Sequence, residues 1–211
     1  MPTEAFFKLP PDRRHAILTA AEQEFSIHSY DKVSVFKIAQ NAGISRSGFY
    51  YYFSGKEDIY QFILFGLRDE LFDSISETGR QYDIFTFFEV LFARIAAYKG
   101  TEREKLIGRI VANLRQGEPF ILEMNAVPTC PPPILRFLSG LDGLRCGSRG
   151  EYLTLGYLLL CGITLVLPRY YGGGCTLEAA QAQLHYIFDL IKHGALKESA
   201  RTELKGTVEK C

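Results

Sequence analysis

Apolar residues recur along most of this chain at the spacing of an α-helix. Near the N-terminus, Ile17, Ala21 and Phe25 fall every four residues and would line one face of a helix that begins at Pro10 and Pro11. Strict alternation of apolar and polar residues is scarce, and no repeat of fixed period is present. The pattern therefore predicts an all-α fold of about nine helices without a defensible strand.

Two short helices are predicted between residues 34 and 53. Ser34 is placed to cap a helix over residues 35–42, and Gly43 follows it, where glycine permits a left-handed turn. Ser45 is placed to cap a second helix over residues 46–52. The two segments, joined by a three-residue turn, form a candidate helix-turn-helix.

A longer helix is predicted to follow at once. Ser54 and Glu57 have the spacing of a capping box, and the apolar positions after them continue to about Ile75. Beyond it, helical spacing predicts segments over 84–98, 102–116, 119–124, 134–141, 151–170 and 177–196, with a proline-rich loop over 126–133. We expect two domains, a small one over residues 1–55 and a larger one over residues 56–211.

Composition is that of an ordinary globular protein, with 47% hydrophobic residues and 24 basic against 24 acidic residues. A net charge of zero argues against a chain that is basic throughout and coats nucleic acid or membranes. The charge is unevenly distributed, however. Residues 31–56 hold four basic residues and one acidic residue, a net +3, so the remainder carries −3.

The sequence predicts neither a metal site nor a cofactor. Its five cysteines and four histidines show no zinc-ligand or redox spacing, so reduced thiols are expected. The first residues do not have the pattern of a secretory signal, and we expect a cytoplasmic protein. The most apolar run, residues 152–167, is shorter than the about 20 residues of a spanning helix, which favours a buried helix and no membrane.

The candidate helix-turn-helix suggests how DNA would be contacted. If Phe49 and Phe53 point into the core, helical geometry places the opposite side outward, and its residues are Arg46, Ser47, Tyr50 and Tyr51. Arginine can bind a guanine edge through two hydrogen bonds, and hydroxyls reach bases or phosphates. Helix N-termini such as the one at Ser45 add backbone donors for phosphate.

About a dozen positions over residues 11–60 resemble the N-terminal domain of TetR/AcrR transcriptional regulators. They lie in the segments Arg14–Ala21, Phe25, Val33–Ala39, Ala42–Ser45, Gly48–Phe53 and Ser54–Glu57. The resemblance implies a dimeric, ligand-responsive regulator, most often a repressor, that binds a palindromic double-stranded DNA operator. It also implies a larger helical domain that binds a small-molecule effector and dimerises through its last two long helices.

The resemblance further implies which residues contact DNA. They are Ser34, Lys37, Ser45, Arg46, Ser47, Gly48, Tyr50, Tyr51, Tyr52 and Lys56, with Ser34 and Lys56 assigned to phosphates. Gly48 departs from the family, which more often has threonine there. It either permits a close approach to the groove or removes one contact. Phe36, at a position that is often polar, could pack against the third helix.

Effector-binding residues are much less marked in the sequence. The aromatic-rich segment over residues 82–92 could line a ligand site, but ordinary core packing explains it equally well. Our candidates for the effector site are Phe65, Phe88, Phe92, Phe120 and Tyr157.

Two other functions remain as alternatives at this point. A helical-bundle enzyme would need a catalytic pattern, and neither a nucleophile elbow nor a glycine-rich phosphate loop occurs in the sequence, so we expect no enzyme. The second alternative is a dimeric module whose N-terminal head binds a protein instead of DNA. Substituting Arg46 and Tyr50 together would distinguish it from a DNA-binding protein, which should then lose DNA recognition and remain a dimer.

Overall fold

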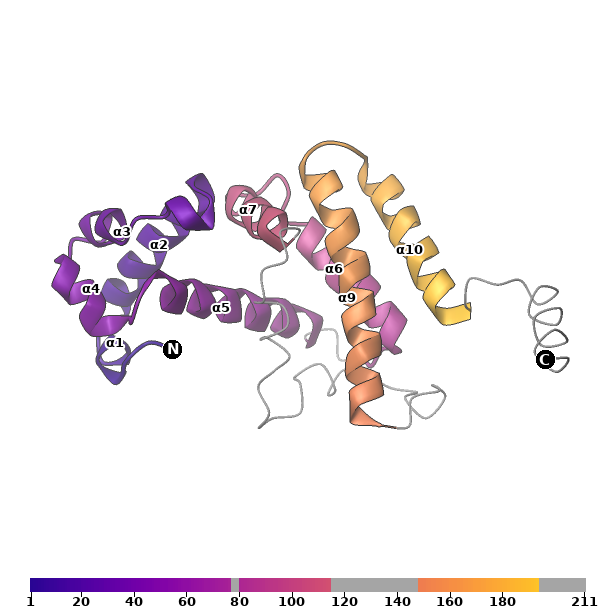
Figure 1. The fold of residues 1–211 in the computed structure, drawn as a ribbon, viewed down its shortest axis with the longest axis horizontal. Helices are drawn as coiled ribbons and strands as arrows, with labels where there is room; N and C mark the ends of the chain where they lie inside the picture. Colours follow the sequence, from indigo (N-terminus) through magenta and orange to yellow (C-terminus); the bar gives the residue numbers. More distant parts are fainter. Residues whose placement is uncertain (77–79, 115–147, 194–211) are drawn as a thin grey trace, which may run out of the picture. The chain divides into compact units, whose positions relative to one another are not determined.

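The computed structural model describes residues 1–76, 80–114 and 148–193. Within these residues the chain forms nine α-helices and one short 3₁₀ helix, and they contain no β-strand, which confirms the predicted all-α fold (Figure 1). The chain divides into two compact units, residues 1–145 and 146–211. The helices predicted over 119–124 and 134–141 lie outside the described residues.

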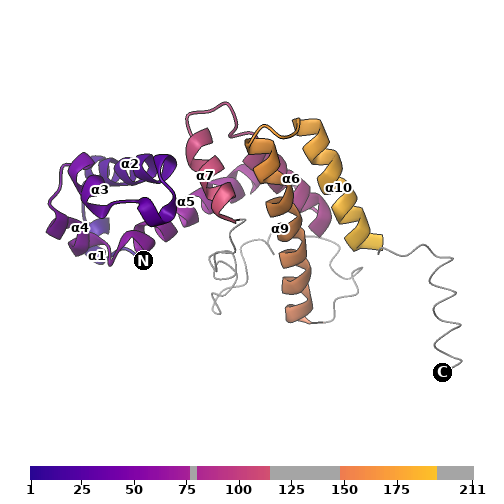
Figure 2. The same ribbon diagram turned by 45° about the horizontal axis from the view of Figure 1, so that its top comes forward.

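The first unit begins with four helices that form a compact head. They are α1 (Glu4–Phe7), α2 (Pro11–Ile27), α3 (Val35–Asn41) and α4 (Arg46–Tyr52). Their shared core contains Ile17, Ala21 and Phe25 from the predicted face of α2, together with Ile38 of α3. Helix α1 was not predicted from the sequence, and it packs against α4 (Figure 2).

The turn between α3 and α4 has the predicted construction. Ser34 and Ser45 are the residues that precede the two helices, and each side-chain oxygen accepts a backbone N–H three residues later. Gly43 has a φ of 66°, a left-handed conformation that costs other residues energy but not glycine. The backbone therefore turns sharply enough to set α4 against α3.

Three further helices complete the described part of the first unit: α5 (Lys56–Ser76), α6 (Ile84–Ala96) and α7 (Glu104–Leu114). Helix α5 packs on both α2 and α6, and α7 packs along α2. The expected capping box at the start of α5 is wrong in one residue. Ser54 donates its N–H and its hydroxyl to Asp58 Oδ2, at 3.0 and 3.2 Å, in place of the predicted Glu57.

The second unit consists, in its described residues, of two packed helices, α9 (Arg149–Tyr171) and α10 (Leu177–His193). Ser148 and Glu151 form a full capping box at the start of α9. The two helices approach closely at Gly162, where a Cβ atom would lie 3.1 Å from the ring of Phe188. Residues Gly150–Tyr171 are long and apolar enough to cross a membrane, a property that a core helix of a globular protein can share.

Candidate nucleic-acid interface

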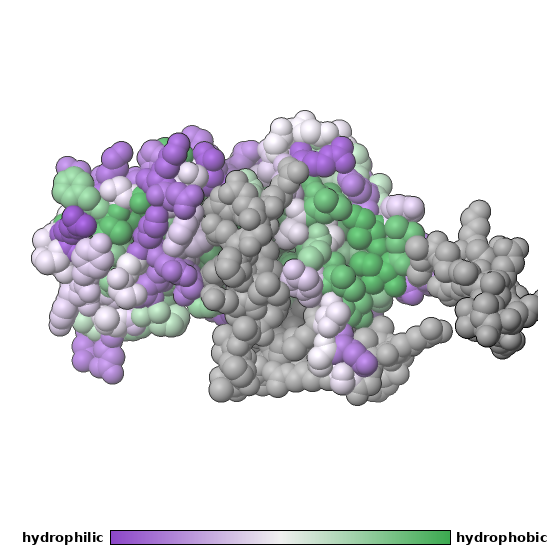
Figure 3. Space-filling model, viewed as in Figure 1, coloured by the Kyte–Doolittle hydropathy of each residue, from purple (hydrophilic) through white to green (hydrophobic). Residues whose placement is uncertain are grey.

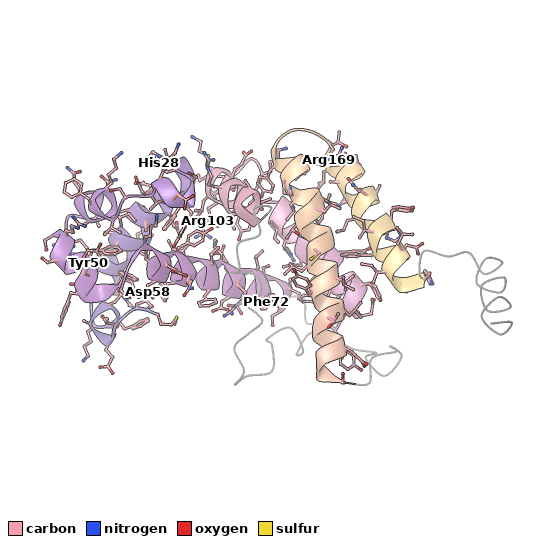
Figure 4. The ribbon with its side chains drawn as sticks, in the orientation of Figure 1. His28, Tyr50, Asp58, Phe72, Arg103 and Arg169 are labelled. Atoms are coloured by element: carbon pink, nitrogen blue, oxygen red, sulfur yellow. The ribbon has the colours of Figure 1, made fainter. Side chains whose placement is uncertain are left out.

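Helix α4 separates its side chains into a buried and an exposed side. Phe49 and Phe53 are fully buried, as the sequence predicted. Arg46 and Ser47 are exposed, and the exposed fractions of Tyr50 and Tyr51 are 46% and 66%. Figure 4 shows Tyr50 at the outer side of the head. The arrangement presents one guanidinium and three hydroxyl groups on one side of two helical turns.

Arg46 and Tyr50 contact each other on this exposed side. The guanidinium carbon of Arg46 lies 5.9 Å from the centre of the Tyr50 ring, within the range of a cation–π interaction. The Tyr50 ring in turn packs edge-on against the buried ring of Phe49, with 5.6 Å between their centroids. Because the tyrosine rests on the core, it limits the directions in which the arginine can point.

At the N-terminus of α4, the hydroxyl of Ser45 contacts the side chain of Ser47 and the backbone of Gly48. Ser45 Oγ accepts the N–H of Gly48 at 3.0 Å and lies 2.9 Å from Ser47 Oγ. A Cβ atom at Gly48 would lie 3.2 Å from the same Ser45 oxygen. The missing side chain of Gly48 therefore leaves room for the serine that caps the helix.

At the N-terminus of α3, the polar groups are partly engaged within the head. The N–H of Ser34 donates to Glu24 Oε1 at 3.2 Å, and Ser34 Oγ accepts the N–H of Lys37 at 3.5 Å. Glu24 is buried and also faces His28, whose Nε2 lies 3.8 Å from its carboxylate. The Lys37 side chain is exposed beside this helix start.

Lys56 does not extend freely from the head. Its ammonium donates to the carbonyls of Tyr30 and Asp31, at 2.9 and 3.2 Å, and lies 4.7 Å from the centre of the Tyr30 ring. An ammonium has three N–H donors, so one remains for a further acceptor beyond these two. Lys56 thus joins the start of α5 to the turn after α2.

The structure differs from the sequence-based expectation at two aromatic residues, Tyr52 and Phe36. Tyr52 is half-buried, with its ring 6.4 Å from that of Phe6, and is less outward than Tyr50 and Tyr51. Phe36 is 60% exposed, so the suggestion that it packs against the third helix is wrong. Spacing alone does not reveal this exposure, because residue 36 is two positions from the buried Ile38 but three positions, one helical turn, from the buried Ala39.

Comparison with known proteins identifies this kind of head. The sequence model of the bacterial regulatory proteins of the tetR family matches residues 17–62, which extend from α2 into α5. Residues 17–62 thus carry the sequence pattern of the tetR family of bacterial regulatory proteins. The match supports a DNA-binding transcriptional regulator, and it covers most of α2, all of α3 and α4, and the start of α5.

Solved structures of TetR regulators share the fold across most of the chain. A regulator from Rhodococcus sp. RHA1 matches with a TM-score of 0.59 and 15% identity, over 84% of this chain and 94% of that one. One from Streptomyces coelicolor has a TM-score of 0.58 and 22% identity, over 92% and 90%. Thermus thermophilus FadR, a TetR-family repressor in complex with lauroyl-CoA, has a TM-score of 0.56 and 22% identity, over 88% and 96%. Among curated proteins, none matches the chain in sequence.

Four of the five aromatic candidates for an effector site lie in the described residues. Phe88 and Phe92 are buried on one face of α6, and Phe65 of α5 is half-buried with the Arg68 guanidinium 4.9 Å from its ring centre. Tyr157 belongs to the second unit and is 38% exposed, and Phe120 lies outside the described residues. A hydrogen bond with Cys161 raises the pKa of Tyr157. The effector residues thus stay a prediction.

The described residues contain no group of three or more histidine, cysteine, aspartate and glutamate side chains able to hold a metal ion. The two described cysteines, Cys161 and Cys175, are free thiols.

Proposed function

We propose that this protein is a homodimeric cytoplasmic repressor of the TetR family that a small-molecule effector releases from a palindromic operator. The exposed side of α4 is the observation that carries the DNA-binding part. Arg46, Ser47, Tyr50 and Tyr51 are directed outward by two fully buried phenylalanines on the opposite side of the same two turns. The head, residues 1–55, reads DNA, and residues 56–211 bind the effector and dimerise.

In this proposal the exposed residues divide between base and phosphate contacts. Arg46 binds a guanine edge, and Tyr50 and Ser47 contact bases or phosphates beside it. The remaining proposed contacts are to the phosphate backbone or within reach of it, and they come from Ser34, Lys37, Ser45, Gly48, Tyr51, Tyr52 and Lys56. Only the backbone of Gly48 would take part, since it has no side chain.

Dimerisation is supported by the apolar surface of the second unit. Leu158 and Leu165 are 47% and 57% exposed and lie seven residues apart, on one side of α9. Figure 3 shows apolar surface gathered over the C-terminal helices. Two copies joined through α9 and α10 would bury it and place two heads about 34–36 Å apart, one turn of DNA.

Release requires an effector that binds one conformation better than the other. In the proposed mechanism the effector binds among aromatic residues of the large domain, such as Phe88 and Phe92, and changes the direction of α5, which carries the head. Apolar compounds are the first probes to test. Lauroyl-CoA, which FadR of Thermus thermophilus binds in its crystal structure, is one of them.

The DNA-binding proposal is tested by selecting duplexes from a random library with the full-length protein. We expect enrichment of a palindrome, and binding that weakens steeply as salt concentration rises. Replacing Arg46 by alanine and Tyr50 by phenylalanine together should remove the sequence preference while dimerisation persists. The matched control is Arg94→Ala, an exposed arginine on α6.

Failure to enrich any sequence, with an intact dimer, would overturn the proposal in favour of a head that binds a protein. Enrichment followed by loss of binding on addition of an effector would support repressor release, and stronger binding with effector would contradict it.

A further inference from the structure

The C-terminal end of α4 is held by residues from the very beginning of the chain. A helix leaves its last carbonyls without partners inside the helix. At the end of α4, the carbonyl of Tyr52 accepts the N–H of Thr3 at 2.9 Å, and that of Tyr51 accepts the Thr3 hydroxyl, also at 2.9 Å. One threonine therefore satisfies two successive carbonyls of the helix that presents Tyr50 and Tyr51.

Thr3 makes this contact in place of its usual local one. It occupies the position before α1, where a threonine oxygen ordinarily accepts a backbone N–H of its own helix. No such side-chain bond to α1 forms here, and the hydroxyl is directed to α4 as a donor. The Thr3 side chain thus links α1 to α4. Toward α1, Thr3 contributes its backbone carbonyl, which accepts the N–H of Phe6.

Phe6 fixes the rest of α1 against the same region. It is 1% exposed, and its ring lies 4.9 Å from that of Phe53, the residue directly after α4, and 5.6 Å from that of Phe62 in α5. Because this anchor is three residues from Thr3, the threonine has little freedom to leave the α4 carbonyls.

We propose that Thr3 is a positioning residue for DNA recognition, which fixes the last turn of α4 so that Tyr50 and Tyr51 meet the operator in one orientation. Tyr51 shows the connection directly. Its carbonyl accepts a hydrogen bond from Thr3, while its side chain, 66% exposed, is among the most exposed aromatic side chains of the head. The inference rests on the proposed function, since it concerns how the head binds DNA, and it assigns to α1 a role in that binding.

The test compares Thr3→Val, which keeps the shape and loses the donor, with Thr3→Ser, which keeps the hydroxyl. The matched control is Thr19→Val on α2, the same substitution in the same head away from α4. For each full-length variant, affinity is measured for a duplex selected with the wild-type protein and for an unrelated duplex. Amide hydrogen exchange is measured at Tyr52 and Phe53.

We expect Thr3→Val to weaken binding to the selected duplex about two- to tenfold, the effect of one hydrogen bond. Binding to the unrelated duplex should change less than twofold, because it depends on charge rather than on the orientation of α4. Exchange at Tyr52 and Phe53 should become faster, and Thr3→Ser and Thr19→Val should behave as the wild type does.

Three results would overturn the inference. They are an unchanged ratio of selected to unrelated binding in Thr3→Val, equal losses in Thr3→Ser, and unchanged exchange at the end of α4. If the wild-type protein itself selects no sequence, the proposed function fails instead. That failure is recognised before any Thr3 variant is made.

Discussion

The head of the first unit and the α9–α10 pair of the second differ in how far the apolar residues of their helices are buried. In the head, Phe6, Phe49 and Phe53 are fully buried within the head and the start of α5, and much of the exposed surface of α4 is polar or phenolic. In the pair, Leu159 and Ile163 are buried, but leucines remain exposed on the same helix. Removing apolar area from water is worth about 25 cal/mol per Å². Helix α4 therefore buries its phenylalanines within the head, whereas burying the exposed leucines of the pair would need a partner.

The difference teaches what exposure means in each region. On the head, an exposed aromatic such as Tyr51 carries a hydroxyl that can bind a base or a phosphate. On the pair, Leu158 and Leu165 carry no polar group at all. The first surface suits a charged and hydrated partner, and the second suits another apolar surface, which in the proposed dimer is a second copy of the chain.

The largest expected effect comes from replacing the exposed leucines of the α9–α10 pair by charged residues. Replacing Leu158 and Leu165 by glutamate should give a monomer, because burying two charges in an interface opposes association. Operator affinity should then fall at least about a hundredfold, since the two heads no longer bind as one unit. Sedimentation and DNA titration measure both. The control, Ala93→Glu on the exposed side of α6 with Ala97→Glu directly after the helix, should remain dimeric. A dimeric variant with Leu158 and Leu165 replaced would contradict the assignment.

A second prediction concerns the contribution of the buried Asp58, at the start of α5, to the stability of the head. This residue is 6% exposed, and Figure 4 shows it at the start of α5. Burial alone would raise its pKa, but hydrogen bonds from the N-terminal amine and from Ser54 outweigh burial and leave the pKa lowered. Asp58→Asn should cost about 1–3 kcal/mol of unfolding free energy at neutral pH.

The pH dependence of this effect follows from the sign of the shift. A carboxylate whose pKa is lowered on folding stabilises the protein above its unfolded pKa, about 4, and loses that effect as the pH falls through the folded value. The difference between wild type and Asp58→Asn in urea unfolding should therefore shrink in acid. A difference that is constant from neutral pH down to strong acid would show that the charge contributes nothing.

A third prediction concerns the close contact inside the pair. Alanine at Gly162 would bring a methyl group within 3.1 Å of Phe188 and 3.2 Å of Ile187. Crowding costs about 1–3 kcal/mol, and alanine returns up to about 1 kcal/mol through helix propensity. Urea unfolding at fixed protomer concentration should show a net loss. Gly150→Ala, near the start of α9, has no neighbour closer than 4.0 Å and is the control. Equal stability of the two variants would mean that the helices separate easily.

The smallest expected effect is at Gly48. A methyl group there would be directed back to Ser45 Oγ and not toward the exposed side of α4. We expect Gly48→Ala to change unfolding free energy by less than about 1 kcal/mol, since propensity and crowding oppose each other. Affinity for the selected duplex should stay within about threefold. A large loss of affinity with unchanged stability would favour the other explanation, a close approach of the backbone to the groove.

Sequence reasoning succeeded where short-range signals decide the structure. The bounds of α4 follow from the Ser45 cap and the spacing of Phe49 and Phe53, and the turn before it follows from Gly43. It failed at α1, because a four-residue helix exists only through distant partners such as Phe53 and Phe62.

The start of α5 shows a second kind of limit. Serine and glutamate three residues apart predict a capping box, yet the buried carboxylate of Asp58 receives the Ser54 N–H. Spacing alone does not decide between neighbouring acids, since the choice depends on which one the surrounding core encloses. The effector site is harder still, because a buried aromatic such as Phe92 looks the same in sequence whether it packs a core or lines a cavity.

The contacts of Lys56 bear on how such a regulator can be rebuilt. Its ammonium is bound by two carbonyls of the turn after α2, and Asp58 and Phe62 contact head residues as well. A chimera that receives only residues 1–55 of this head would lack Lys56, Asp58 and Phe62. The recipient's own residues at these positions would contact a turn that they do not match. Heads of this type should be transplanted with the first two turns of α5 attached, so that a new operator preference arrives together with the residues that hold it in shape.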